Sequence, residues 1–425
     1  MAVERHPSTS RTGDPGWEVR TATEAEIPDA SRVFTTAINI PMEELLGVER
    51  DHPVDDPDRI LVALDGDRVV GTANSHRFAL SVPGGPRPAA GVTGVGVWPT
   101  HRRRGVLTAI MRHQLADVRA RGENLAILWA SEGGIYGRHG YGRAAHQHTV
   151  AVRRAHAALR PDAPRDPGLT VELAAPADVL PELDRLHRAA LTRRPGGFPR
   201  EGHWWGVRLW MLSRPRPDTS DLRVALVRGP DGALLGSALH RVTTQDGEDG
   251  LPAGKVTVHE PIALTPAART ALYEYLFATD LTVETVVVGL PDDDPLPALL
   301  ADPAQAVRRT TGALWLRLVD VPAALAERSY AHPVDTVIEV ADRHAPWNAG
   351  RWHLKTDGAD TRVEATDTAP DLTVDVSHLG AAHLGRGPLT TRVDAGTAVE
   401  HTPGAAARLD TALYTPRAPL CDTGF

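Results

Sequence analysis

Three consecutive arginines followed by a glycine form the first group of residues whose types and spacing could do chemistry. They occupy positions 102–105, between an apolar run that ends at Trp98 and a stretch with apolar residues at helical spacing from Val106. The run before them is rich in β-branched residues, which favours a strand that stops at Pro99. The sequence therefore predicts a strand, a basic turn and a helix that ends near Gly122.

The chemistry that such a turn supports is phosphate binding. The first turn of a helix leaves backbone N–H groups without intrahelical partners and carries a partial positive charge, and glycine lets a ligand approach the backbone closely. Arginine side chains add charge-assisted hydrogen bonds to phosphate oxygens. An Arg-Arg-Arg-Gly turn alone is equally compatible with a solvated helix start, so the surrounding pattern has to decide.

The wider pattern V-x-V-x-P-x-x-R-R-x-G-V, which starts at Val95 and ends at Val106, resembles the acyl-CoA signature of the GCN5-related N-acetyltransferases (GNAT). In that family the strand pairs with the pantetheine arm of the cofactor and the turn holds its pyrophosphate. The chain has no G-x-x-x-x-G-K-[ST], and G-x-G-x-x-G is missing at the turn. Nucleoside triphosphate and dinucleotide sites are therefore not expected.

A glycine-punctuated segment, A-S-E-G-G-I-Y-G-R-H-G-Y-G at residues 130–142, follows an apolar strand predicted from Leu125 to Trp129. Together with the basic turn it is similar to the enhanced intracellular survival (Eis) branch of the family. The resemblance extends to the length of 425 residues and to an aromatic last residue. It implies an α/β fold with mixed α+β sheets: tandem GNAT domains, the second degenerate, followed by a sterol-carrier-protein-like domain.

The order of predicted elements divides the chain into three parts. Residues 1–155 form the acetyltransferase domain with the acetyl-CoA site, and a Pro-rich linker follows at 161–168. Residues 156–315 repeat the strand–helix–strand order but lack the arginine turn, so we expect a GNAT-like domain that cannot hold CoA. Residues 316–425 contain four short alternating strands and two helices, and the resemblance makes them the domain that delivers the terminal carboxylate.

The resemblance assigns the acyl-CoA contacts residue by residue. They are expected on the strand, on the basic turn with the first turn of its helix, and after the next strand: Val95, Gly96, Val97, Arg103, Arg104, Gly105, Val106, Leu107, Thr108, Ser131 and Glu132. Acetyl-CoA is thus the expected co-substrate. The expected reaction is direct transfer of its acetyl group to an amine.

Acyl transfer also needs a proton for the departing thiolate, and Tyr136 is the predicted donor. A phenol titrates at about 10 and a thiol at about 8.5, so a tyrosine is protonated at neutral pH and can donate as the thiolate forms. The position of Tyr136 in G-G-I-Y-G-R-H-G-Y-G matches the proton donor of the Eis family. Tyr141 is the alternative donor; without the resemblance, either residue is typical of a packed tyrosine.

The resemblance implies an unusual general base, the carboxylate of the last residue, here Phe425 in A-P-L-C-D-T-G-F. An α-carboxylate has a pKa of about 3.5, so it is a weak base at neutral pH unless it is desolvated or acts through water. The alternative is a frayed terminus, the usual state of last residues. An aromatic residue after Gly424, with no charged tail, favours a packed end.

Composition sets the remaining expectations. A net charge of -8 argues against a nucleic-acid partner and favours cationic ones. No run of about 18 apolar residues occurs, so we expect no membrane span, and the polar N-terminus favours a cytoplasmic protein. The lone cysteine, Cys421, excludes an internal disulfide, and the scattered histidines predict no metal site.

The sequence therefore predicts an acetyl-CoA-dependent N-acetyltransferase that acts on cationic acceptors, either aminoglycoside-like molecules or lysine side chains. By resemblance the assembly is a homo-oligomer, a hexamer. Asp29, Glu43 and Glu44 could attract such an acceptor or could form solvated helix faces. The competing hypothesis is a non-catalytic protein that binds acyl-CoA or another hydrophobic ligand as a sensor.

Overall fold

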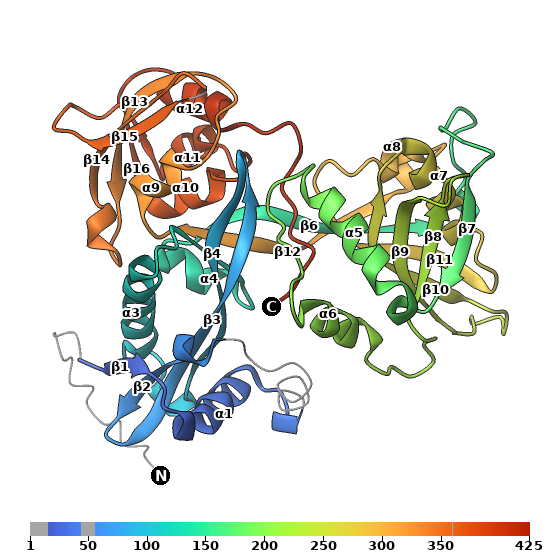
Figure 1. The fold of residues 1–425 in the computed structure, drawn as a ribbon, viewed down its shortest axis with the longest axis horizontal. Helices are drawn as coiled ribbons and strands as arrows, with labels where there is room; N and C mark the ends of the chain where they lie inside the picture. Colours follow the sequence, from blue (N-terminus) through green and yellow to red (C-terminus); the bar gives the residue numbers. More distant parts are fainter. Residues whose placement is uncertain (1–15, 44–55, 359) are drawn as a thin grey trace, which may run out of the picture. The chain divides into compact units, whose positions relative to one another are not determined.

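The structure, a computed structural model, describes residues 16–43, 56–358 and 360–425 (Figure 1). The chain divides into two compact units, Met1–His76 with Val92–Asp117, and Arg77–Gly91 with Val118–Phe425. Three elements run through both units: β3 (Arg68–Val82), β4 (Gly85–Val97) and α3 (Val106–Ala120). Within the described part of the chain, no helix is long and apolar enough to cross a bilayer.

The first unit is a sheet with a helix against each face. Besides parts of the shared elements, it contains β1 (Glu18–Thr21), a 3-10 turn (Glu24–Glu26), α1 (Ile27–Ile38), a second 3-10 turn (Pro57–Arg59), β2 (Leu61–Asp65) and a third (Pro99–His101). The strands lie in the order β1-β2-β3-β4, and β2 runs antiparallel to both β1 and β3. Successive strand residues point to opposite faces, so Val62 packs in the cluster with α1 and Ala63 in the cluster with α3.

The second unit carries the sheet onward from the ends of β3 and β4. Its elements up to residue 318 are β5 (Leu125–Trp129), α4 (Gly133–Tyr136), β6 (Gly142–Arg153), β7 (Thr170–Ala174), α5 (Leu180–Leu191), α6 (Trp204–Ser213), β8 (Arg223–Arg228), β9 (Leu234–Thr243), β10 (Gly254–Ala263), α7 (Pro266–Phe277), β11 (Thr282–Leu290), α8 (Leu296–Leu299) and β12 (Val307–Leu318). The strand order is β4-β5-β12-β6-β11-β10-β9-β8-β7. We call β1 to β6 with their helices the first half, and β7 to β12 with theirs the second half.

Strand β12, which the sequence patterns did not predict, joins the two halves. It runs antiparallel between β5 and β6, so that Leu314 faces Trp129 on one side and Ala145 on the other. Strand β6 in turn pairs with β11. The last strand of the second half therefore completes the sheet of the first half.

The C-terminal part is a separate five-stranded sheet with helices packed against it. It contains α9 (Val321–Ala326), β13 (Val334–Ala341), β14 (Gly350–Thr356), β15 (Thr361–Ala365), β16 (Leu372–Asp375), α10 (Val376–Ala382), α11 (Leu389–Asp394), β17 (Val399–Glu400) and α12 (Ala405–Leu413). The strand order is β15-β14-β13-β16-β17. The four predicted strands are confirmed. After α12, the terminal segment (residues 414–425, red in Figure 1) runs past β6 and β12 and ends near α6.

Candidate active site

The end of β4 has the backbone features of a ligand-binding strand. Gly94, shortly before the last residue of this strand, has a φ of 61°, which is typical of a β-bulge that re-aims neighbouring backbone groups. Gly96 is buried against α1, because a Cβ there would lie 3.0 Å from the Cα atom of Phe34. Val95 and Val97 point to the opposite face and pack with the α3 cluster. Packing on both faces therefore fixes the position of this end of β4 and of its backbone N–H and C=O groups.

The basic turn after β4 holds two residues in the left-handed conformation. Arg103 has a φ of 61° and Gly105 a φ of 87°. A positive φ costs an arginine free energy, so the rest of the turn must stabilise it. Gly105 directly precedes α3, and it has no side chain that could cap the helix. The backbone N–H groups of the first turn of a helix have no partner within that helix, so residues 106–108 are candidates for binding an anion.

Contacts within the first unit fix this turn. The guanidinium of Arg102 donates to the carbonyl oxygen of Ala37 at 2.8 Å, and the indole of Trp17 donates to that of Arg104 at 2.9 Å. The Arg104 guanidinium also stacks on the Trp17 ring, at 5.2 Å from its centroid. Arg103 and Arg104 are exposed. Two exposed guanidinium groups beside the start of a helix suit the diphosphate of CoA.

Strand β5 leads to the other predicted cofactor contacts. The parallel ladder between β4 and β5 covers only three residue pairs, from Ala89 with Leu125 to Gly91 with Ile127. Beyond it, Ser131 and Glu132 are exposed just before α4. A short ladder followed by exposed polar residues leaves this end of β5 accessible to a ligand.

Tyr136 and Tyr141 pack edge to face, with ring centroids 6.0 Å apart. Tyr141 is only 1% exposed, whereas Tyr136, at the end of α4, is half-buried. Burial raises the pKa of the Tyr136 phenol and also that of Tyr141. A proton donor must reach the substrate, so the difference in exposure favours Tyr136, and its role stays a prediction.

The terminal segment is packed in the second unit. The ring of Phe425 contacts those of Phe78 and Phe198, at centroid distances of 5.0 and 5.8 Å, and these two rings stack on each other at 3.9 Å. Phe425 is half-buried and packs against the main core cluster of the unit. Such packing opposes the fraying expected of last residues.

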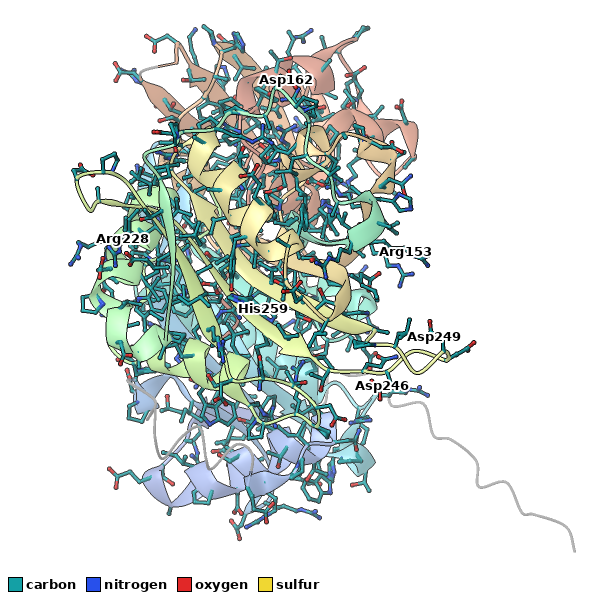
Figure 2. All side chains as sticks on the ribbon, turned by 90° about the vertical axis from the view of Figure 1, so that its right-hand side faces the viewer. Arg153, Asp162, Arg228, Asp246, Asp249 and His259 are labelled. Carbon is teal, nitrogen blue, oxygen red and sulfur yellow. The ribbon has the colours of Figure 1, made fainter. Side chains whose placement is uncertain are left out.

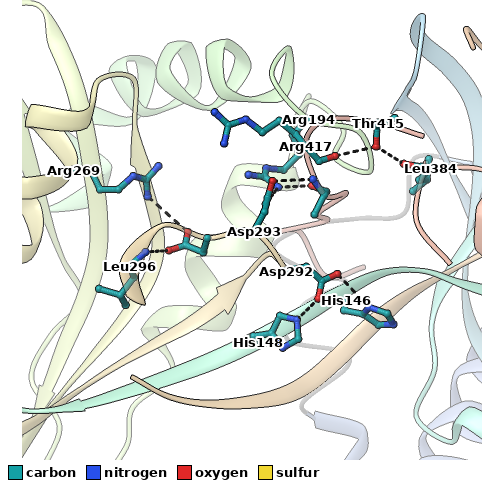
Figure 3. A network of polar contacts seen from close by, with 12 residues as sticks. His146, His148, Arg194, Arg269, Asp292, Asp293, Leu296, Leu384, Thr415 and Arg417 are labelled. Atoms are coloured by element: carbon teal, nitrogen blue, oxygen red, sulfur yellow. Dashed lines mark hydrogen bonds and ion pairs between the residues drawn. The ribbon is translucent and has the colours of Figure 1, made fainter. Parts of the chain in front are cut away.

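Hydrogen bonds hold the backbone of the terminal segment at several points. The Trp129 indole donates to the carbonyl oxygen of Thr423 at 3.1 Å, and the Gln147 amide donates to that of Cys421. Upstream, the Ala418 N–H donates to Asp293 at 3.0 Å, beside the ion pair of Asp293 with Arg194 (Figure 3). Both halves of the sheet therefore contact the terminal segment.

Two further side chains singled out in the sequence are not suited to chemistry. Cys421 is 1% exposed, and burial raises the pKa of its thiol to about 12, so the reactive thiolate is absent at neutral pH. Asp29 pairs with Arg32 on the exposed face of α1, as a solvated helix face would. Glu43 is exposed, and Glu44 lies outside the described residues.

Family models match three successive parts of the chain. An acetyltransferase (GNAT) domain matches residues 18–144, a second acetyltransferase (GNAT) domain matches residues 196–318, and a sterol carrier protein domain matches residues 321–422. The predicted fold class, tandem GNAT domains followed by a sterol-carrier-protein-like domain, is confirmed.

Relatives cover most of the chain. An uncharacterised N-acetyltransferase of Streptomyces avermitilis is 41% identical over 87% of this chain and 90% of its own. N-acetyltransferase Eis of Mycobacterium tuberculosis is 37% identical over 75% of this chain and 77% of its own. The crystal structure of Eis1 from Mycobacterium abscessus matches 96% of this chain and 100% of its own, with 32% identity and a TM-score of 0.79. The chain therefore belongs to the Eis family of GCN5-related N-acetyltransferases, enzymes that use acetyl-CoA as co-substrate.

Proposed function

We propose that this N-acetyltransferase transfers acetyl directly to an amine of a cationic acceptor, either an aminoglycoside-like molecule or a lysine side chain. The net charge of -8 supports a cationic acceptor, because a negative surface attracts it. The packed terminal segment carries the proposal, since it keeps Phe425 against the core of the second unit.

The cofactor contacts in this proposal are those that the family resemblance assigns. The backbone of residues 95–97 pairs with the pantetheine arm, Arg103, Arg104 and residues 105–108 bind the diphosphate, and Ser131 and Glu132 provide further contacts. The left-handed conformation of Gly105 and the exposed guanidinium groups support the diphosphate assignment.

Tyr136 and Phe425 handle the protons. Acetyl-CoA, when bound, supplies the acetyl group as a thioester. As the acceptor nitrogen forms its bond to the acetyl carbon and the C–S bond breaks, Tyr136 donates its phenolic proton to the departing sulfur. The carboxylate of Phe425 accepts the proton that the nitrogen loses. Desolvation raises the basicity of a carboxylate, so packing of the Phe425 ring against Phe78 and Phe198 supports this role.

An extension of the chain tests the base. Adding Gly-Ser after Phe425 converts its carboxylate into a neutral amide, so kcat should fall at least about tenfold while KM for acetyl-CoA stays within about twofold. The same dipeptide at the N-terminus is the control for the addition itself. Full activity of the C-terminally extended protein would exclude the Phe425 carboxylate as the base.

A thiol-release assay tests the acetyl transfer and the acceptor class together. Release of CoA thiol from acetyl-CoA is measured with aminoglycosides, linear polyamines and lysine peptides. We expect turnover with at least one polycationic class. Binding of CoA without turnover of any amine would favour the non-catalytic sensor instead.

The assembly is a homohexamer in this proposal, on the strength of the family resemblance alone. Sedimentation equilibrium at micromolar concentration measures the molar mass directly. A mass that corresponds to six chains is the expected result, and a monomer over the whole concentration range would contradict it.

A further inference from the structure

Four charged side chains are buried together where the terminal segment meets the second half. They are Arg200, Arg208 from α6, Glu260 from β10 and Asp422 from the terminal segment, with side-chain exposures of 0%, 15%, 5% and 19%. Two are positive and two are negative, so the group is neutral as a whole. Removing one member would leave a buried charge uncompensated, which is costly.

Arg200 joins the second half to the terminal segment with one guanidinium group. Its Nη1 and Nη2 atoms donate to the two carboxylate oxygens of Glu260, both at 2.8 Å. Its Nε atom donates to the hydroxyl of Thr423 at 2.9 Å, and Nη2 lies 3.4 Å from Asp422. The group also stacks on Trp205 at 4.5 Å. Only arginine offers donors on two edges of a rigid plane in this way.

Glu260 reaches this position through a local irregularity of β10. Its φ is 51°, an unfavourable value for a residue other than glycine, and the pairing of β10 with β9 shifts register between His259 and Ile262. The next residue is Pro261, which cannot donate to a ladder. A bulge at this point aims the Glu260 carboxylate at Arg200, and Arg208 donates to the same carboxylate. Residues with strained backbone conformations of this kind are often found at functional sites.

Asp422 has additional partners. Nε2 of His187 on α5 lies 3.2 Å from its carboxylate, and the Thr423 hydroxyl donates to it at 3.0 Å. Burial opposes ionisation of Asp422, but His187 and Arg200 outweigh that cost and hold the pKa of its carboxyl below the ordinary range. Asp422 is therefore ionised at neutral pH. With Glu260 it balances the two positive charges of Arg200 and Arg208.

We infer that Arg200 and Glu260 are positioning residues for the terminal carboxylate, and that the second half, which lacks the arginine turn, acts as the anchor of the terminal segment. Thr423 is held on one side by Arg200 and on the other by Trp129 at the end of β5. Phe425 follows two residues later, so the clamp at Thr423 limits where its carboxylate can lie. The inference rests on the proposed role of Phe425 as the base.

The test uses two variants of the full-length protein, Glu260→Gln and Thr423→Val. Each variant weakens hydrogen bonding to the Arg200 guanidinium. The fraction of molecules in which the terminal segment is detached should therefore rise about tenfold or more. We expect carboxypeptidase A to release Phe425 about ten times faster from both. We also expect kcat to fall about fivefold to tenfold, with KM for acetyl-CoA within about twofold. Thr423→Ser keeps the hydroxyl and should rescue both measurements.

The control is Glu182→Gln, which weakens a bidentate pair of Arg228 with Glu182 outside the terminal segment. Figure 2 shows Arg228 at the edge of the second half, away from His259, the neighbour of Glu260. This variant should leave the release of Phe425 and kcat unchanged. It separates the loss of any ion pair from the loss of the anchor.

The two readouts separate the possible failures. Unchanged release of Phe425 and unchanged kcat in both variants would overturn the anchor. Faster release with unchanged kcat would overturn the role of Phe425 as the base, and with it the positioning role, while the structural anchor would stand. If Glu260→Gln does not fold, Thr423→Val decides alone, because valine has nearly the shape of threonine.

Discussion

The two halves of the sheet build the same strand-to-helix connection with different residues. Between β4 and α3, Gly105 precedes the helix and offers no side chain that could cap its first N–H groups. Between β10 and α7, the Thr265 hydroxyl accepts the N–H of Ala268 at 3.1 Å, and Pro266 has no N–H to offer. The N–H groups at the start of a helix can bind an anion only if no residue of the chain already accepts their hydrogen bonds. The fold alone therefore does not make a CoA site.

The segments after the next parallel strands differ as well. Strand β5 leads to the exposed Ser131 and Glu132 and to Tyr136. Strand β11 leads to an acidic loop, Pro291–Pro295, whose side chains are engaged with the protein itself (Figure 3). Asp292 accepts from His148 at 2.7 Å, and Asp293 holds Ala418 of the terminal segment. In the proposed function, the first half binds its ligand at these strand ends, whereas the second half uses the corresponding residues to hold the terminal segment.

The substitution with the largest expected effect on turnover is at Tyr136, which only the first half provides. Tyr136→Phe removes the proposed proton donor, so kcat should fall about 100-fold while the affinity for CoA is unchanged. Because burial raises the pKa of Tyr136, its phenol stays protonated at least up to the ordinary tyrosine value of about 10. The rate of the unmodified enzyme should therefore show no decline from loss of this proton below that pH.

The control for Tyr136→Phe is Tyr414→Phe, a change at a tyrosine that is 46% exposed. It should leave kcat and its pH profile unchanged. Equal losses of turnover and of CoA affinity in Tyr136→Phe, measured by steady-state kinetics and calorimetry, would count against a donor role.

A smaller effect is expected from Gly105→Ala, which makes the first connection resemble the second. A Cβ on a residue with a φ of 87° strains the turn and lies where the diphosphate approaches. We expect KM for acetyl-CoA to rise about tenfold, with a smaller change in kcat. The matched control is Gly122→Ala near the other end of α3, where φ is 77° and no atom lies within 4 Å of the added Cβ. Equal losses in both variants would mean that strain, and not ligand access, explains the effect.

Local patterns were enough to predict the first connection from the sequence. A β-rich run, a breaker, a glycine and a helical repeat lie within about thirty residues, and the structure has β4, the turn and α3 in those places. The assignments of Tyr136 and Phe425 came from resemblance, because nothing local distinguishes a catalytic tyrosine from a packed one.

Long-range pairing explains what the sequence did not reveal. Strand β12 begins with the exposed polar residues 308–311, so it lacks the apolar alternation of a strand, and its place between β5 and β6 depends on partners far away in the chain. Arg200 lies 60 residues from Glu260 and 223 residues from Thr423. Each of these residues alone is typical of a solvated surface, and only the fold shows that they are buried together.

The smallest effect is expected at Thr265, where the second connection is closed. Thr265→Ala removes the hydroxyl that caps α7, so the free energy for opening the first turn of this helix should fall by about 1 kcal/mol. Hydrogen exchange at Ala268 and its neighbours measures this change, and KM for acetyl-CoA should not move because α7 takes no part in cofactor binding. An uncapped α7 still begins with Pro266 and has no arginine turn, so opening its N-terminus should not create a second CoA site. Binding of two CoA molecules per chain by this variant would show that the cap alone separates the two halves.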